Sequence, residues 1–339
     1  MDIAVTRLDP ADQEAALRAY EIDLAAGAVD VPDLPPPSRR AFLARVADPG
    51  PGYRHEYAIA RVDGVPAGFM RLDLPFLDNL HNADLEIYVH PTYRRRGVGR
   101  ALHAYAVGLA ARDGRKHLAG MSPTALPGGP ARDGAFAAFA QSVGAYVALT
   151  DVRRRLDIAA VDDAALDGAL AGAWQHAPGY SLVQWSGATP EEIVADVAYL
   201  DGRLLADAPM GDLTWEPEKV DAQRIREMEA TNTRRGRQLY HTGVRHDASG
   251  RLVGWTTLSR YEDPDWHAWQ LITIVDPDHR GHRIGTIVKI ENLRYTLMAE
   301  PTLRYIDTFN AAENDHMISI NELMGFRPVD AWHNWQQDL

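Results

Sequence analysis

The chain has 339 residues, a length that fits two ordinary domains better than one. Hydrophobic residues make up 46% and charged residues 24%, which is typical of a globular chain and excludes a disordered one. The net charge of −12 argues against a general nucleic-acid binder, because phosphate contacts need clustered lysines and arginines. Cysteine is absent, which excludes disulfides, thiolate metal sites and a cysteine nucleophile.

No apolar run approaches the roughly 18 residues that a membrane-spanning helix needs. Residues 1–10 carry neither the basic region nor the apolar region of a signal peptide. We therefore expect a cytoplasmic protein with no membrane partner and no nucleic-acid partner. Neither composition nor pattern indicates an oligomeric state.

Strand and helix patterns occur in the same order in both halves of the chain, which indicates an internal repeat. Each half reads as strand, two helices, hairpin, strand, helix, strand, helix and strand. In the first half these elements are expected at residues 3–8, 13–26, 39–46, 56–62 with 67–73, 85–89, 98–112, 117–121, 135–143 and 146–158. In the second half they are expected at residues 180–185, 191–200, 220–231, 239–245 with 252–258, 269–275, 284–298, 305–309, 315–324 and 332–335.

This order predicts an α/β fold, in the sense of an α+β mixed sheet, present twice. We expect an N-terminal domain at residues 1–158 and a C-terminal domain at residues 179–339. Residues 159–178, which are rich in Ala, Asp and Gly, are expected to form the linker between them.

The most specific feature of the first half is the turn that leads from a strand into a helix at residues 89–100. A helix start leaves backbone N–H groups that bind anions, and Gly97 and Gly99 let a bulky anion approach the backbone. The glycine spacing matches neither a P-loop nor a dinucleotide-binding fingerprint. The expected pyrophosphate-binding residues are Val89, Arg94, Arg95, Arg96, Gly97, Val98, Gly99 and Arg100.

The second half repeats this turn with one departure, since Arg283 stands where the first turn has Gly97. The alternative for both turns is a basic helix start that merely caps itself, and the bulky Arg283 makes that alternative stronger for the second turn. The expected binding residues of the second turn are Val275, Arg280, Gly281, His282, Arg283, Ile284, Gly285 and Thr286.

The pattern Arg94-x-x-Gly97-x-Gly99 resembles the coenzyme A pyrophosphate turn of the GNAT (Gcn5-related N-acetyltransferase) superfamily. The order of elements around it is also similar, and the segment from Asn310 to Phe326 looks like the closing helix of GNAT domains. The layout resembles the tandem GNAT group that includes mycothiol synthase. The resemblance implies two tandem acyl-CoA N-acyltransferase domains that use acetyl-CoA as co-substrate, with Asn310 and Asn314 near the pantetheine arm.

Acyl transfer from a thioester to an amine requires a neutral amine, a stabilised oxyanion and a protonated leaving thiolate. We expect transfer of an acetyl group from acetyl-CoA to an amine of a small molecule by direct attack, without a covalent enzyme intermediate. A non-catalytic acyl-CoA-binding or sensing protein is the first alternative, and a plain interaction domain is the second.

Glu86 is the first candidate for the general base, because alternation along its strand places it on one face with Tyr88 and His90. Ile272 occupies the equivalent place in the second half, so His267 is the candidate there. GNAT enzymes often carry a tyrosine acid four residues before the closing glycine, where this chain has Asn321.

Each of these candidates has a structural alternative. Glu86 fits a solvated surface carboxylate equally well, and Asn321 fits a residue that only orients its helix. The missing tyrosine leaves the general acid open in both halves. The histidine spacing matches no metal site, so no metal is expected.

Overall fold

The computed structural model describes residues 2–339 and divides into two compact units. Unit 1 comprises the chain up to Thr150 together with Met210–Glu216 and Asp330–Leu339. Unit 2 comprises Asp151–Pro209 and Pro217–Val329. The number of units agrees with the expectation from the sequence, whereas the boundaries differ from the expected 1–158 and 179–339.

Unit 1 is a mixed sheet with the strand order β1-β2-β3-β4-β5-β12. Its strands are β1 (Ile3–Arg7), β2 (Tyr53–Val62), β3 (Val65–Pro75), β4 (Asn82–Val89), β5 (His117–Ala125) and β12 (Arg327–Asp338). Its helices are α1 (Gln13–Asp30), α2 (Arg39–Ala47), the 3-10 turn η1 (Pro91–Tyr93), α3 (Val98–Arg112) and α4 (Ala135–Ser142).

Helices cover both faces of this sheet. The apolar stripe of α3, which includes Leu102 and Ala106, packs with Met70 and Leu72 of β3 on one face. On the other face α1 and α2 pack against the second set of alternating strand residues, including Phe69. Asp12 caps the start of α1, because its side chain accepts a hydrogen bond from the N–H of Ala15 at 3.0 Å.

Unit 2 repeats this arrangement with the strand order β6-β11-β10-β9-β8-β7. Its strands are β6 (Tyr146–Asp157), β7 (Tyr180–Ser186), β8 (Arg237–His246), β9 (Leu252–Tyr261), β10 (His267–Val275) and β11 (Tyr305–Ala311). Its helical segments are η2 (Ile158–Ala160), α5 (Asp163–Gln175), α6 (Val194–Gly202), α7 (Leu204–Asp207), α8 (Ala222–Arg234), η3 (Pro277–His279), α9 (Ile284–Ala299) and α10 (Asp315–Met324).

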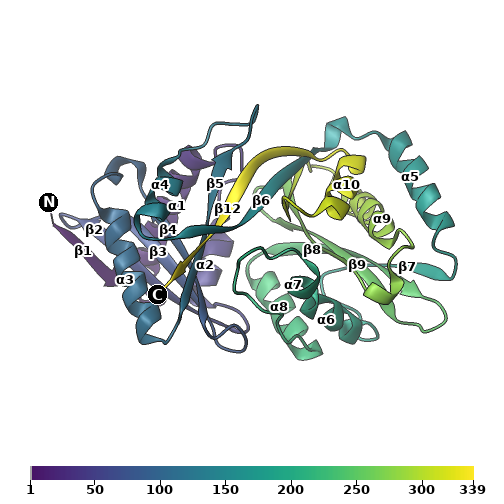
Figure 1. Cartoon of the computed structure of the whole chain (residues 1–339), viewed down its shortest axis with the longest axis horizontal. Coiled ribbons are helices and arrows are strands. Elements are labelled where there is room, and N and C mark those ends of the chain that lie inside the picture. Colours follow the sequence, from purple (N-terminus) through teal and green to yellow (C-terminus); the bar gives the residue numbers. More distant parts are fainter. Residues whose placement is uncertain (1) are drawn as a thin grey trace. The chain divides into compact units, whose positions relative to one another are not determined.

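The last strand of each half belongs to the sheet of the other unit. β12 runs antiparallel to β5 from Asp330 to Asp338, so the C-terminal strand of the chain completes unit 1, as Figure 1 shows in yellow. In return, residues 151–157 of β6 pair with β11 in unit 2. The alternating pattern identifies both strands correctly but does not identify their partners, which is why the expected boundaries differ.

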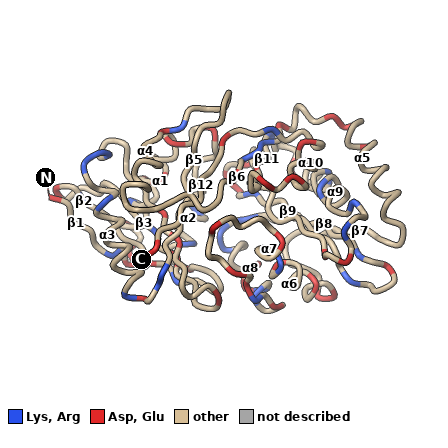
Figure 2. The backbone as a smooth tube through the Cα atoms, in the orientation of Figure 1, with Lys and Arg blue, Asp and Glu red and all other residues tan. Residues whose placement is uncertain are grey.

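The segment expected to be a linker contains a helix. α5 occupies Asp163–Gln175, and its buried residues Leu166, Leu170 and Ala173 belong to the core of unit 2. Among residues 2–339, no helix is long and apolar enough to cross a membrane. Figure 2 shows that acidic and basic residues are interspersed along both units.

Candidate functional site

Two parallel strands separate in each unit, and the separation leads to the turn singled out in the sequence. In unit 1, β4 and β5 pair only at Asn82–Asp84 with His117–Ala119. In unit 2, β10 and β11 pair only at His267–Trp269 with Tyr305–Asp307. Beyond these three-residue ladders the strands diverge, so an extended ligand would find backbone hydrogen-bonding groups along the gap.

The turn of unit 1 has the geometry of an anion site. Gly97 adopts φ = 89°, a left-handed conformation that glycine favours, and α3 begins at the next residue. No side chain caps this helix. The N–H groups of Val98, Gly99 and Arg100 therefore have no intrahelical partner and lie at the positive end of the helix dipole. Arg95, Arg96 and Arg100 are exposed beside them.

Arg94 has a bracing role in this turn. Its guanidinium forms two hydrogen bonds to the Asp30 carboxylate, at 2.6 and 2.8 Å, and its Nε donates to the carbonyl of Val89 at 3.1 Å. These bonds tie the turn to the end of α1 and to β4. The sequence suggested that Arg94 binds phosphate directly, but its donors are already engaged.

The turn of unit 2 has the same design with fewer available donors. Arg280 Nε donates to the carbonyl of Val275 at 3.3 Å, and its Nη2 lies 3.0 Å from Asp207. The N–H of Thr286 already donates to the carbonyl of Arg283 at 3.1 Å. Only Ile284 and Gly285 are left without an intrahelical partner at this helix start, compared with three residues in unit 1.

Arg283 takes the left-handed conformation that Gly97 takes in unit 1, with φ = 55°. A residue with a side chain costs roughly 1 kcal/mol or more in this region, whereas glycine adopts it without that cost. We expect Arg283→Gly to stabilise unit 2 by about 1 kcal/mol, as measured by a rise in thermal unfolding temperature. Arg283→Ala keeps the left-handed strain and removes the same charge, so an equal rise in that control would contradict this explanation.

A glycine beneath each helix start sets how closely the helix approaches the sheet. A Cβ atom at Gly68 would lie 2.9 Å from both the Tyr88 carbonyl oxygen and a methyl carbon of Val98. A Cβ atom at Gly254 would lie 2.4 Å from a methyl carbon of Ile284. Both helices therefore begin directly on the strand, which fixes the position of their free N–H groups.

On the face of unit 1 covered by α1 and α2, polar side chains line up in rows across β2, β3 and β4. We call these residues the unit 1 ladder. One row joins His55, Asp73 and Asp84, and the next joins Tyr57, Arg71 and Glu86. A third row brings Tyr88 against Phe69, with ring centroids 4.9 Å apart. The pairing register places the whole ladder on one side of the sheet.

Arg71 is the centre of the ladder and is buried, with 8% of its surface exposed. Its Nε lies 2.9 Å from Asp73, and its Nη2 donates to Glu86 at 2.9 Å. The second carboxylate oxygen of Glu86 accepts a hydrogen bond from the Tyr88 hydroxyl at 3.2 Å. Glu86 thus faces the site with both oxygens engaged and about a third of its side chain exposed.

The carboxyl groups of this face differ in their ease of ionisation. Burial opposes ionisation of Asp73, but the hydrogen bond from His55 and the charge of Arg71 outweigh it and lower its pKa. Burial raises the pKa of Asp84 to about 7, and the charges of Asp73 and Glu86 add to this effect. Burial likewise raises the pKa of Asp23, on α1, to about 7, with the charge of Glu86 as the second cause.

The corresponding face of unit 2 is aromatic and uncharged in the same rows. His241 and Thr257 stand where unit 1 has Tyr57 and Arg71. His241 is stacked on Trp185, with ring centroids 4.9 Å apart, and burial lowers its pKa to about 3. A β-bulge between Gln270 and Thr273 interrupts β10 at the level of Glu86, and the residue there is Ile272.

The structure places the remaining candidates of unit 2 away from one another. His267 lies at the paired beginning of β10, buried, with its Nε2 2.8 Å from Asp307. Asn321 is buried on α10, where its Nδ2 donates to Asn310 at 2.6 Å. Asn314 caps α10 through the N–H of Met317. His267 and the two-asparagine contact therefore do not form one constellation.

Sequence reasoning missed Asp23, Arg71, Asp73 and Asp84, although each left a signal. Asp23 interrupts the stripe of small buried residues on α1 that contains Ala16, Ala19 and Ala26. A carboxylate on the apolar face of a helix is unusual and indicates a partner or a function. Arg71 and Asp73 alternate with apolar residues on β3 in the same way.

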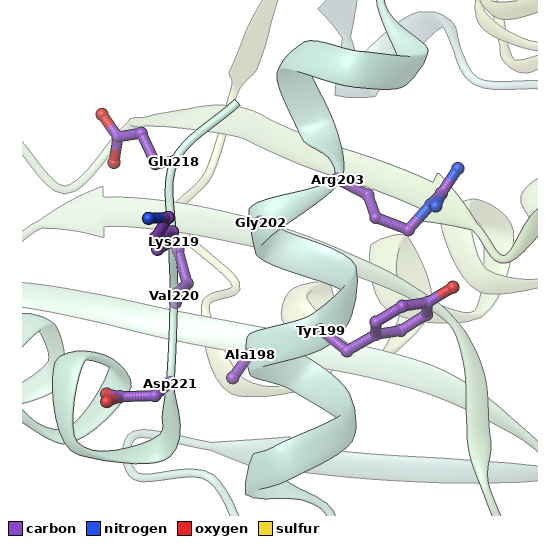
Figure 3. A pocket seen from close by; sticks show the side chains of 8 residues that line it. All are labelled: Ala198, Tyr199, Gly202, Arg203, Glu218, Lys219, Val220 and Asp221. Atoms are coloured by element: carbon purple, nitrogen blue, oxygen red, sulfur yellow. The ribbon is translucent and has the colours of Figure 1, made fainter. Parts of the chain in front are cut away.

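A shallow pocket of about 390 Å³ lies in unit 2, between α6 and the segment that precedes α8 (Figure 3). Figure 3 shows Tyr199 and Arg203 directed away from residues 218–221. Its lining residues are Ala198, Tyr199, Gly202, Arg203, Glu218, Lys219, Val220 and Asp221. None of them belongs to the turn at 275–286, so we assign this pocket no role in the site.

Residues 16–123 match the model of the acetyltransferase (GNAT) family. A mycothiol acetyltransferase of Salinispora arenicola (strain CNS-205) is 37% identical over 98 residues, which cover 29% of this chain and 30% of that protein. The match therefore spans less than a third of that relative.

Solved structures match over nearly the whole chain. A tandem GNAT protein from the clavulanic acid biosynthesis pathway is 32% identical, covers 99% of this chain and 98% of its own, and has a TM-score of 0.85. A GCN5-related N-acetyltransferase from Sphaerobacter thermophilus, 12% identical, covers 99% and 95% with a TM-score of 0.61. The second likeness concerns the fold alone.

Proposed function

Because this chain belongs to the GNAT acetyltransferase family, with two tandem GNAT units, we propose that it transfers an acetyl group from acetyl-CoA to an amine of a small molecule. The observation that carries this proposal is the helix start at Gly97 and Val98, with three N–H groups available next to the diverging strands β4 and β5. A pyrophosphate bound there would direct the rest of the donor along the strand gap.

We assign the transfer step to unit 1. Its ladder carries carboxylates within one strand of the gap, and an amine needs such a group to lose its proton near neutral pH. The neutral amine attacks the thioester carbonyl directly, and N–H groups along β4 are suitable donors to the developing oxyanion. No covalent enzyme intermediate is required, which fits a chain without cysteine.

We assign unit 2 an acyl-CoA-binding role without transfer. Its turn keeps the helix start and the bracing Arg280, which favours binding. However, Ile272 and Thr257 replace the charged pair of Glu86 and Arg71, and His241 is buried and neutral. His267 as base and Asn321 as acid in this unit remain predictions, as do the roles of Asn310 and Asn314.

Matched charge reversals in the two turns test these assignments. Arg100 and Thr286 are both the third residue of their helix, so a glutamate there would sit beside the bound diphosphate. We expect Arg100→Glu to weaken acetyl-CoA binding to unit 1 by at least about 100-fold, because it replaces an attractive charge with a repulsive one. A glutamate in the first turn favours the helix itself, so stability is retained.

Isothermal titration with acetyl-CoA gives the number of sites and the affinity of each. Release of free thiol in the presence of a panel of alkyl amines and amino sugars gives turnover. We expect Arg100→Glu to abolish turnover and Thr286→Glu to leave it within about threefold of the original chain. Loss of turnover only in Thr286→Glu would reverse the assignment, and full acetyl-CoA binding in both variants would refute the turns as binding sites.

A further inference from the structure

Asp23 projects from α1 into the core that covers the unit 1 ladder. We propose that Asp23 accepts the proton of the acceptor ammonium, and that Glu86 is a positioning residue that holds this region in place. This inference rests on the proposed acetyl transfer in unit 1 and assigns its proton acceptor to a residue that strand alternation did not reveal.

Glu86 is poorly suited to accept the proton itself. One of its oxygens is bonded to Arg71 at 2.9 Å, and the other is bonded to Tyr88 at 3.2 Å. A guanidinium directly on a carboxylate favours its charged form, so a proton placed on Glu86 would have to displace that ion pair. These same bonds make Glu86 a fixed negative charge in a defined position.

Asp23 has the opposite environment. It is buried, with 9% of its surface exposed, and no residue of the described chain donates a hydrogen bond to its carboxyl group. Arg71, nine-tenths buried within the ladder, also has one nitrogen, Nη1, without a partner among residues 2–339. An unpartnered carboxyl group beside an unpartnered guanidinium nitrogen indicates a place where a polar ligand group belongs.

The groups around Asp23 favour a proton acceptor that works near neutral pH. Burial is the main reason that its pKa rises to about 7, and the charge of Glu86 is the next. Arg45 and Arg71 oppose this rise. The titratable and charged groups of the elements packed around α1 are Arg45 on α2, Tyr57 on β2, Arg71 on β3, Glu86 and Tyr88 on β4, and Arg94 after η1.

The proton balance of the reaction follows from this placement. The acceptor ammonium gives one proton to the Asp23 carboxylate and becomes a neutral amine. The amine nitrogen attacks the thioester carbonyl, the carbon–nitrogen bond forms and the carbon–sulfur bond breaks. The second proton of the nitrogen goes to the departing CoA thiolate, and Asp23 releases its proton to solvent. The products are the amide and free CoA.

The pH dependence of kcat/KM, measured with the best acceptor of the amine panel, tests this proposal. We expect the rate of the original chain to rise with pH through the titration of Asp23. Asp23→Asn should lower kcat at least about 100-fold and abolish this rise, with the KM for acetyl-CoA unchanged. Glu86→Gln removes the charge that holds up the pKa of Asp23, so it should keep the rise and move it to lower pH.

Glu21→Gln is the matched control, because it removes a carboxylate two residues away on the exposed face of α1. It should leave the profile unchanged. Asp23→Asn with a retained rise in rate, or Glu86→Gln with the rise abolished, would overturn the assignment to Asp23 while the acetyl transfer stands. An original chain that releases no thiol with any amine, although it binds acetyl-CoA, would instead refute the proposed function and this inference together.

Discussion

Arg71→Met is expected to lower the free energy of unfolding of unit 1 by roughly 3–5 kcal/mol. The guanidinium is buried between Asp73 and Glu86, at 2.9 Å from each. Its removal leaves two carboxylates facing each other across neighbouring rows of the ladder without a cation between them. Differential scanning calorimetry measures the effect as a lower unfolding temperature of unit 1, and acetyl transfer should fall with it.

Two further variants separate this explanation from a general loss of packing. Arg71→Met combined with Glu86→Gln should recover part of the lost stability, because one of the uncompensated charges is gone. Arg7 forms an ion pair of the same 2.9 Å length with Glu56, but its side chain is 65% exposed. Arg7→Met should therefore cost less than about 1 kcal/mol. An equal cost for the two single variants would show that burial does not decide the effect.

Lys289→Met is expected to stabilise unit 2, by roughly 4 kcal/mol near pH 7.5. Lys289 lies in α9 with 1% of its surface exposed and its Nζ 5.3 Å from the centre of the Phe326 ring. No described residue forms an ion pair with it, and burial lowers its pKa from 10.5 to about 7. Methionine keeps a side chain of similar length against Phe326 without a charge to bury.

The pH dependence of this gain has a definite sign. In the unfolded chain Lys289 binds its proton below about pH 10.5, whereas in the folded chain it does so only below about pH 7. The original chain therefore loses stability as the pH falls through this window, and the advantage of Lys289→Met should grow from pH 10 to pH 7. Lys116→Met, at an exposed position, should show no such change. A constant difference across this range of pH, measured by thermal unfolding, would mean that Lys289 keeps its ordinary pKa.

The sequence was most informative where local backbone chemistry decides the structure. Gly97 before a helical stripe predicts a left-handed residue at an uncapped helix start, and the structure has φ = 89° there. Ser38 caps α2 as expected from its place before the helix. These features depend on neighbours a few residues away in the chain, so one sequence suffices to predict them. Alternation along residues 85–89 likewise placed Glu86 and Tyr88 on one face.

What the sequence could not supply are the partners of these elements in space. The strand at residues 332–335 was recognised, but its pairing with β5 was not, because alternation defines the faces of a strand and leaves its neighbour open. Asp23 was hidden in a helix that reads as an ordinary Ala-rich segment. Only the packing of α1 on β3 and β4 brings its carboxyl group near Glu86, and only burial there changes its pKa. Local order was therefore determined by the sequence alone, whereas domain boundaries and the chemistry of the site depended on contacts between distant segments.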